Sequence, residues 1–161
     1  MKYATSRLIR AAALVLTTVA VGACSDDPVG PREATDVEFD ASLGVDLSSM
    51  ERLPTGTYIK TLQEGEGLNV VNGDVTIAYT LWLWDGTQVD QSSSFTFALD
   101  GGTVIEGFNE GVKGMRLNET RLIVIPSAQG YGPATRPGIP AHSVLVFRVE
   151  LKAATASEGP S

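Results

Sequence analysis

Three short segments in the last third of the chain contain the residue types that can build a binding pocket. They are residues 104–112, 125–132 and 137–151. Together they place Phe108 on a short helical stretch, Tyr131 on a loop rich in Gly and Pro, and Phe147 on a closing strand. None of these side chains is a nucleophile, a metal ligand or a strong base. An apolar cavity with a few polar groups binds an apolar group in a fixed orientation, so the segments predict such a cavity.

The charge of the chain argues against several other functions. Its 161 residues leave room for one ordinary domain and some tail. The formal net charge is −7, whereas proteins that bind phosphate backbones carry a basic face. The single histidine, His142, offers no set of metal ligands, and we expect it to form a local hydrogen bond beside Pro140. We therefore expect no nucleic-acid partner, no metal and no cofactor.

The amino end has the pattern of an export signal. It begins with three basic side chains, Lys2, Arg7 and Arg10. The apolar stretch 11–21 is too short to cross a bilayer as a helix, which takes about 20 residues. Small residues then precede Cys24, the only cysteine of the chain. This arrangement resembles a bacterial lipoprotein signal in which Cys24 is acylated; the alternative is an ordinary secretory signal, with Cys24 incidental.

The lipoprotein interpretation predicts where the protein is located in the cell. Residues 1–23 are then the signal peptide, and Cys24 anchors the chain by lipid to a membrane of the cell envelope, facing the periplasm or the exterior. Ser25 follows the cysteine, and by the same resemblance this residue favours the outer membrane over the inner one.

The remaining chain divides by composition. Residues 24–40 are acidic, contain Pro and Gly, and are expected to form a flexible tether. Residues 41–55 carry scattered apolar side chains and are expected to pack as an irregular extension on a domain formed by 56–152, with a disordered tail at 153–161.

Within the domain, hydrophobic periodicity predicts an α+β fold. The expected strands are 57–62, 74–84, 87–91, 95–99, 119–125 and 143–152, and the one helix is 107–115. Asp85-Gly86 is a strong hairpin signal. Along 74–84, alternation puts Tyr79 on one face and Trp82 and Trp84 on the other, where we expect the extension to shield them.

The order of these segments resembles the FKBP-type peptidyl-prolyl isomerase domain over about 56–152. That resemblance implies an antiparallel sheet of about five strands wrapped around one short helix. It also implies a reaction without covalent catalysis. Rotation about an X-Pro bond has a barrier of about 20 kcal/mol because amide resonance must be broken. A protein lowers this barrier by removing the amide from water and binding the twisted geometry best.

The resemblance also implies which residues form the pocket. Asp90 and Tyr131 are expected to act in catalysis, and the substrate-binding wall is Tyr79, Phe95, Val104, Ile105, Phe108, Ile139 and Phe147. Phe108 would be the floor beneath the prolyl ring. The N–H of Ile105 and the hydroxyl of Tyr131 would hold substrate carbonyls. Asp90 would sit at the rim, hydrogen-bonded to the hydroxyl of Tyr79.

Some of these residues have an ordinary structural alternative. Each Phe in a strand could be plain core, whereas Tyr131, between two glycines on a loop, has no core to fill. The chain also departs from the family pattern. Val89 stands where a Phe is frequent, and the short stretch between Asp90 and Phe95 lacks the basic residue that many members carry. The loop from Tyr131 to residue 142 is also shorter, which shifts the alignment of Ile139.

These observations favour a monomeric prolyl isomerase that acts on proline-containing polypeptides, assists envelope proteins to fold and binds a macrolide inhibitor. The alternative is a lipoprotein of the same fold that holds proline peptides, or acts as a chaperone, without catalysis.

Overall fold

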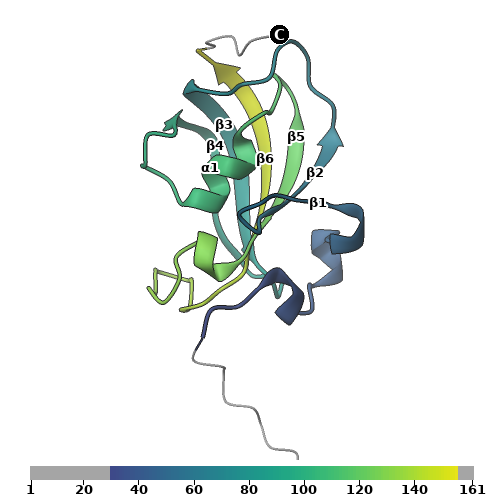
Figure 1. Cartoon of the computed structure of the whole chain (residues 1–161), viewed down its shortest axis with the longest axis vertical. Coiled ribbons are helices and arrows are strands. Elements are labelled where there is room, and N and C mark those ends of the chain that lie inside the picture. The colour runs from purple at the N-terminus through teal and green to yellow at the C-terminus, as the bar shows by residue number, and fades with distance from the viewer. Residues whose placement is uncertain (1–29, 156–161) are drawn as a thin grey trace, which may run out of the picture.

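A six-stranded antiparallel sheet wraps around a single short α-helix in the computed structural model (Figure 1), which describes residues 30–155. The strands are β1 (Glu51–Arg52), β2 (Tyr58–Gln63), β3 (Gly73–Leu83), β4 (Gln88–Leu99), β5 (Thr120–Ile125) and β6 (Leu145–Ala154), in the sheet order β1-β2-β5-β6-β3-β4. The helix is α1 (Glu106–Val112), and four 3₁₀ turns are η1 (Ala34–Asp36), η2 (Ala41–Leu43), η3 (Leu47–Ser49) and η4 (Ser127–Gln129). The α+β class and the sheet around one helix are thereby confirmed. The signal peptide and Cys24 lie outside the described residues.

The pairing of β3 with β4 corrects one sequence prediction. Residues 87–91 and 95–99 were predicted as separate strands, but they form the single strand β4. Ile77 pairs with Phe95, and two residues further along β3 Tyr79 pairs with Ser92, so β4 carries one extra residue in a β-bulge. The bulge keeps the chain in the ladder where the polar run of serines suggested a break.

Helix α1 lies against β5 because two glycines on it have no side chain. A Cβ at Gly107 would overlap Ile125, and a Cβ at Gly111 would overlap Ile123. Phe108, next to Gly107, is buried beside them. The helix was predicted at 107–115 and is shorter at its end, where Lys113 leaves the helical conformation.

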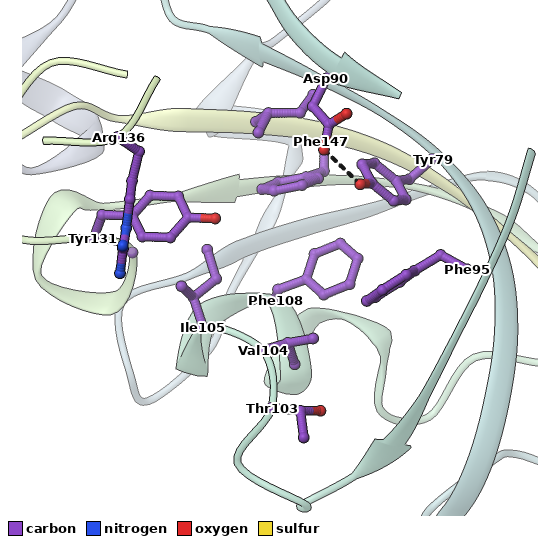
Figure 2. A pocket seen from close by; sticks show the side chains of 12 residues that line it. Tyr79, Asp90, Phe95, Thr103, Val104, Ile105, Phe108, Tyr131, Arg136 and Phe147 are labelled. Carbon is purple, nitrogen blue, oxygen red and sulfur yellow. Dashed lines mark hydrogen bonds between the residues drawn. The ribbon is translucent and has the colours of Figure 1, made fainter. Parts of the chain in front are cut away.

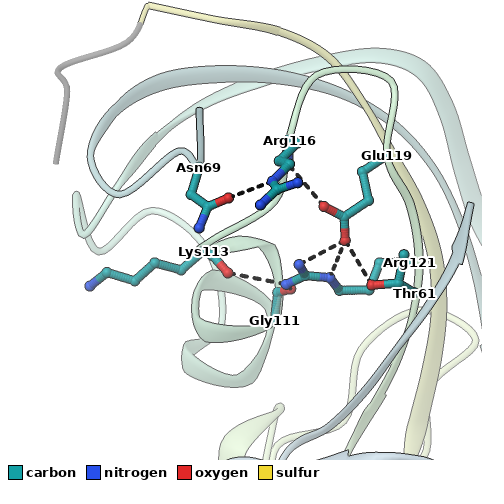
Figure 3. Close-up of polar contacts among 7 residues, drawn as sticks. All are labelled: Thr61, Asn69, Gly111, Lys113, Arg116, Glu119 and Arg121. Atoms are coloured by element: carbon teal, nitrogen blue, oxygen red, sulfur yellow. Dashed lines mark hydrogen bonds and ion pairs between the residues drawn. The ribbon is translucent and has the colours of Figure 1, made fainter. Parts of the chain in front are cut away.

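A buried ion pair joins the end of α1 to the sheet (Figure 3). Nη1 of Arg121 donates to the carbonyls of Gly111 at 2.9 Å and Lys113 at 3.1 Å, and its Nε donates to Oε1 of Glu119 at 2.9 Å. Glu119 accepts further hydrogen bonds from the hydroxyl of Thr61 and the N–H of Arg116. Arg121 thus supplies donors to the carbonyls that a helix end leaves without intrahelical partners.

The amino-terminal segment covers the sheet face opposite α1. There Trp82 and Trp84 pack with Leu43 and Met50 in a second hydrophobic cluster, as the strand alternation predicts. Residues 24–40 were predicted to be a flexible tether, and the prediction is wrong for the described part, residues 30–40. Ala34 is 1% exposed, and the main chain of Arg32 forms two hydrogen bonds with Ser127, so the described part of 24–40 packs on the domain. The tail predicted from residue 153 is wrong at its start, because β6 runs to Ala154; residues 156–161 lie outside the described part of the chain.

Candidate functional site

A cavity of about 440 Å³ opens between β3, β4, the start of α1 and the loop after η4 (Figure 2). Its lining residues are Tyr79, Leu81, Asp90, Phe95, Thr103, Val104, Ile105, Phe108, Gly130, Tyr131, Arg136 and Phe147. All of the residues predicted to form the pocket, except Ile139, are among them. Four lining residues were not predicted: Leu81, Thr103, Gly130 and Arg136.

The cavity is built on an aromatic cluster. Phe108 and Phe147 are 4% and 5% exposed, and their ring centroids are 4.7 Å apart. The ring of Tyr79 meets Phe95 and Phe108 edge-on, at centroid distances of 5.8 and 6.1 Å. Such edge-to-face contacts stabilise aromatic pairs beyond area burial. The rings therefore give the cavity a rigid apolar base, with Phe108 at its bottom.

Phe97 supports this base from behind. It is buried, stacks on Phe95 at 5.7 Å and touches Phe108 at the same centroid distance, yet it does not line the cavity. For Phe97 the plain core interpretation is correct. Phe95, Phe108 and Phe147 belong both to the core and to the cavity wall.

One polar pair lies at the rim of the aromatic base. The hydroxyl of Tyr79 donates to Oδ2 of Asp90 at 2.6 Å, and the N–H of Gln91 donates to Oδ1 at 2.8 Å. Burial, the hydrogen bond to Asp90 and the negative charge of Asp90 raise the pKa of Tyr79 to about 12. Tyr79 is therefore a protonated donor at neutral pH, and it fixes the direction of the carboxylate.

Two hydrogen-bond donors at the cavity have no acceptor in the described part of the chain. The carbonyl of Ile105 accepts the first bonds of α1, but its N–H donates to no described residue. The hydroxyl of Tyr131 likewise has no partner among residues 30–155, and it points toward the space above Ile105 (Figure 2). Both donors are free for the carbonyl oxygens of a bound peptide.

The prediction that Ile139 lines the cavity is not met: Ile139 is not among the lining residues, and its side chain is 5% exposed and packs in the main core. A tight turn explains its position. The N–H of Ile139 donates to the carbonyl of Arg136 at 2.9 Å across Pro137 and Gly138, and Gly138 has φ of 75°. Pro followed by a glycine of positive φ is the pattern of a type II turn. The turn directs Ile139 into the core and leaves Arg136 at the cavity.

Two further predictions concerned Val89 and His142. Val89 packs on the core from β4, close to Gly138, and does not line the cavity. His142, expected to form a local hydrogen bond, donates its backbone N–H to the carbonyl of Gly132 at 2.7 Å, whereas its buried Nδ1 has no partner among the described residues. Within 30–155 no group of acidic, His or Cys side chains is arranged to hold a metal. No helix in the same range is long and apolar enough to span a membrane.

Sequence comparison finds the same family over the part of the chain that builds the cavity. A profile of the FKBP-type peptidyl-prolyl cis-trans isomerase family matches residues 68–152. The FK506-binding protein of Neisseria meningitidis serogroup B is 43% identical over 102 residues, which cover 60% of this chain and 94% of that protein. The mouse peptidyl-prolyl cis-trans isomerase FKBP2 is 46% identical over 85 residues, or 49% of this chain and 61% of that protein.

Solved structures agree with the sequence matches. FkpA from Escherichia coli superposes with a TM-score of 0.60 and 35% identity, covering 65% of this chain and 51% of that one. A peptidyl-prolyl cis-trans isomerase from Pseudomonas syringae superposes with a TM-score of 0.62 and 31% identity, covering 72% and 87%.

The fold and the cavity define a protein with an antiparallel sheet around one helix and an aromatic cavity, which is faced by two hydrogen-bond donors that have no acceptor among the described residues. Together with the matches, they show that the chain belongs to the FKBP-type peptidyl-prolyl cis-trans isomerase family. Its activity is the interconversion of cis and trans peptide bonds before proline.

Proposed function

We propose that this isomerase acts on exported polypeptides from a lipid anchor on Cys24 in the cell envelope, where it assists their folding. The observation that carries the proposal is the amino-terminal pattern of basic residues, a short apolar stretch and small residues before the only cysteine.

In the cavity we assign the prolyl ring to the apolar base formed by Phe108, Phe147 and Tyr79. The N–H of Ile105 and the hydroxyl of Tyr131 then hold the substrate carbonyls, since both donors face the cavity without a described partner. The aromatic surroundings exclude water, and a planar amide loses more by desolvation than a twisted one, whose resonance is interrupted. The site thereby binds the twisted amide better than either planar isomer.

Asp90 has a separate role in this scheme. Its carboxylate is held at the rim by Tyr79 and by the N–H of Gln91, and in the described residues it forms no ion pair. We assign the carboxylate a position facing the carbonyl group of the twisted amide, where its fixed negative charge stabilises the partial positive charge on the carbonyl carbon. Preorganised charge of this kind needs no rearrangement during the reaction.

The same cavity supports the binding of a macrolide inhibitor. Its aromatic base can hold an apolar ring, and its two free donors can donate hydrogen bonds to carbonyl oxygens. The Neisseria meningitidis relative is named an FK506-binding protein.

The envelope assignment is tested by fractionating cells that express the full chain. Intact-mass analysis of the membrane fraction is expected to show a chain that begins at Cys24 and carries acyl groups. Cys24→Ala should block processing or release the protein from the membrane, while Ser25→Ala serves as the matched control and should stay anchored. A wild-type chain found soluble, with another first residue, would refute the anchor and leave the isomerase assignment untouched.

A further inference from the structure

The one basic side chain among the residues that line the cavity belongs to Arg136. Its guanidinium lies over the ring of Tyr131, with its carbon 5.4 Å from the ring centroid (Figure 2). In the described part of the chain it forms no ion pair and its side chain donates no hydrogen bond. A cation with five donors therefore stands at the cavity wall without a protein acceptor.

The backbone of Arg136 is held firmly, although its side chain is exposed. Its N–H donates to the carbonyl of Ile139, and its carbonyl accepts the N–H of Ile139, both at 2.9 Å. Ile139 is buried in the core, so the turn is fixed at one end. The contact with Tyr131 then limits the directions that the long side chain can take. These restraints reduce the entropy that Arg136 would lose on binding a ligand.

Arg136 and Asp90 are the two charged residues that line the cavity, and no ion pair joins them. Asp90 is in β4, where its two oxygens accept hydrogen bonds from the hydroxyl of Tyr79 and the N–H of Gln91; the turn after Arg136 packs close to this strand, because Gly138 lies against Val89. Arg136 is on the wall formed by the loop of Tyr131 (Figure 2). The chain as a whole is acidic, with a net charge of −7, so an acidic peptide is attracted only through local contacts.

We infer that Arg136 is a specificity-determining residue that favours proline peptides with an acidic side chain next to the proline. The planar guanidinium matches a carboxylate in a two-point hydrogen bond. A peptide whose carbonyl is held by the hydroxyl of Tyr131 presents its neighbouring side chains to this same wall. The inference rests on the isomerase activity and on the peptide orientation proposed above.

The experiment compares kcat/KM for matched peptides that differ only in Glu against Gln, at the position before proline in one pair and after proline in the other. Wild type is expected to prefer Glu by roughly twofold to fivefold at one of the two positions, the range of an exposed ion pair. The preference should shrink at high salt, because exposed charges are screened. Arg136→Gln should bring the ratio to about one, and Arg136→Glu should reverse it.

The ratio within each variant is the decisive quantity, because it is independent of any general loss of activity. If a variant turns over too slowly, the ratio of peptide Kd values from an NMR titration replaces it. A Glu/Gln ratio at or below one in wild type at both positions, or a preference unchanged in Arg136→Glu, would overturn the inference. Absence of catalysis on the neutral Gln peptides would instead remove the isomerase activity itself, a separate failure that the same measurements reveal.

Discussion

The hydroxyl of Tyr79 on β3 donates a 2.6 Å hydrogen bond to the carboxylate of Asp90 on β4. Leu81 lies two residues after Tyr79 and therefore on the same face of β3, and it pairs directly with Asp90 of β4. The side chains of Tyr79 and Asp90 therefore both face the cavity. This hydrogen bond connects the aromatic base to the carboxylate at the rim of the cavity. The pKa of Tyr79 therefore reports on the position of Asp90.

The first prediction uses that reporter. In Asp90→Asn the pKa of Tyr79 should fall from its value of about 12, because the hydrogen bond to a carboxylate and the negative charge are removed. It should remain above the ordinary 10.0, because burial is the largest cause of the shift and persists. An NMR titration of ring-labelled tyrosine, with Tyr79→Phe to assign the signal, measures both values. An identical pKa in wild type and Asp90→Asn would show that the two groups are not in contact.

The same shift predicts a dependence of stability on alkaline pH. The folded chain keeps the Tyr79 proton up to about pH 12, whereas an unfolded chain releases it near 10.0. The group's contribution to stability is therefore complete below about pH 10 and is lost as the pH rises through 10 to 12. Denaturant unfolding across that range should show a smaller loss in Tyr79→Phe than in wild type; an equal loss in both would contradict the assignment.

The second prediction separates a cavity residue from a core residue. Tyr131→Phe keeps the ring and removes a hydroxyl that has no described partner, so stability should change by less than about 0.5 kcal/mol. Its kcat/KM should fall by roughly twofold to tenfold, the value of one hydrogen bond to the substrate. Phe147→Ala should destabilise the fold by about 3–5 kcal/mol as well as lower activity, because its ring is buried. Equal stability losses in the two variants would indicate that Tyr131 is a structural residue.

The third prediction concerns the buried pair of Arg121 and Glu119, whose side chains are 8% and 4% exposed. Arg121→Met should cost about 3–5 kcal/mol, because Glu119 is left buried without its cation. The matched control is Lys113→Met, which breaks an exposed pair with Asp100 and should cost less than about 1 kcal/mol. Chemical denaturation measures both, and a loss for Arg121→Met as small as that of the control would mean that the pair does not hold α1.

The fourth prediction concerns the packed amino-terminal segment. Ser127 is fully buried, and its hydroxyl accepts the N–H of Arg32 at 2.7 Å. Ser127→Ala leaves that N–H without its acceptor and should cost about 1–3 kcal/mol, with faster hydrogen exchange at Arg32. Ser48→Ala, which loses an exposed hydroxyl contact with Asp46, is the control and should be near neutral. Unchanged exchange at Arg32 in Ser127→Ala would show that the segment is held by other contacts.

The faces of the β3 side chains could be predicted because residues alternate along the strand. Tyr79 and Leu81 therefore face the cavity, and Trp82 and Trp84 face away from it. The α+β fold followed from strand patterns and from one helical stretch, since each pattern is local. All of the predicted cavity residues, Phe108 and Tyr131 among them, were identified through a family resemblance, because no local pattern distinguishes a ring in a wall from a ring in a core.

Two features could not be predicted from local patterns. Asp90 and Phe95 are five residues apart, so simple alternation puts their side chains on opposite faces; the bulge in β4 brings both to the cavity. Ile139 was expected at the cavity and Arg136 was not, but the turn at Pro137 and Gly138 places Ile139 in the core and leaves Arg136 at the cavity. The Pro-Gly pair signals such a turn, but which of its two flanking residues faces the core depends on the tertiary fold.

The central claim is that the cavity catalyses rotation about the X-Pro bond and does not merely bind it. The most direct measurement is NMR exchange spectroscopy on a Leu-Pro peptide at equilibrium with substoichiometric protein. The predicted result is a cis–trans exchange rate that rises in proportion to protein concentration while the ratio of isomers stays constant, and that falls when Phe108 is replaced by Ala. Peptide signals that shift on binding, with an exchange rate no faster than in buffer, would show a proline-binding module without catalysis.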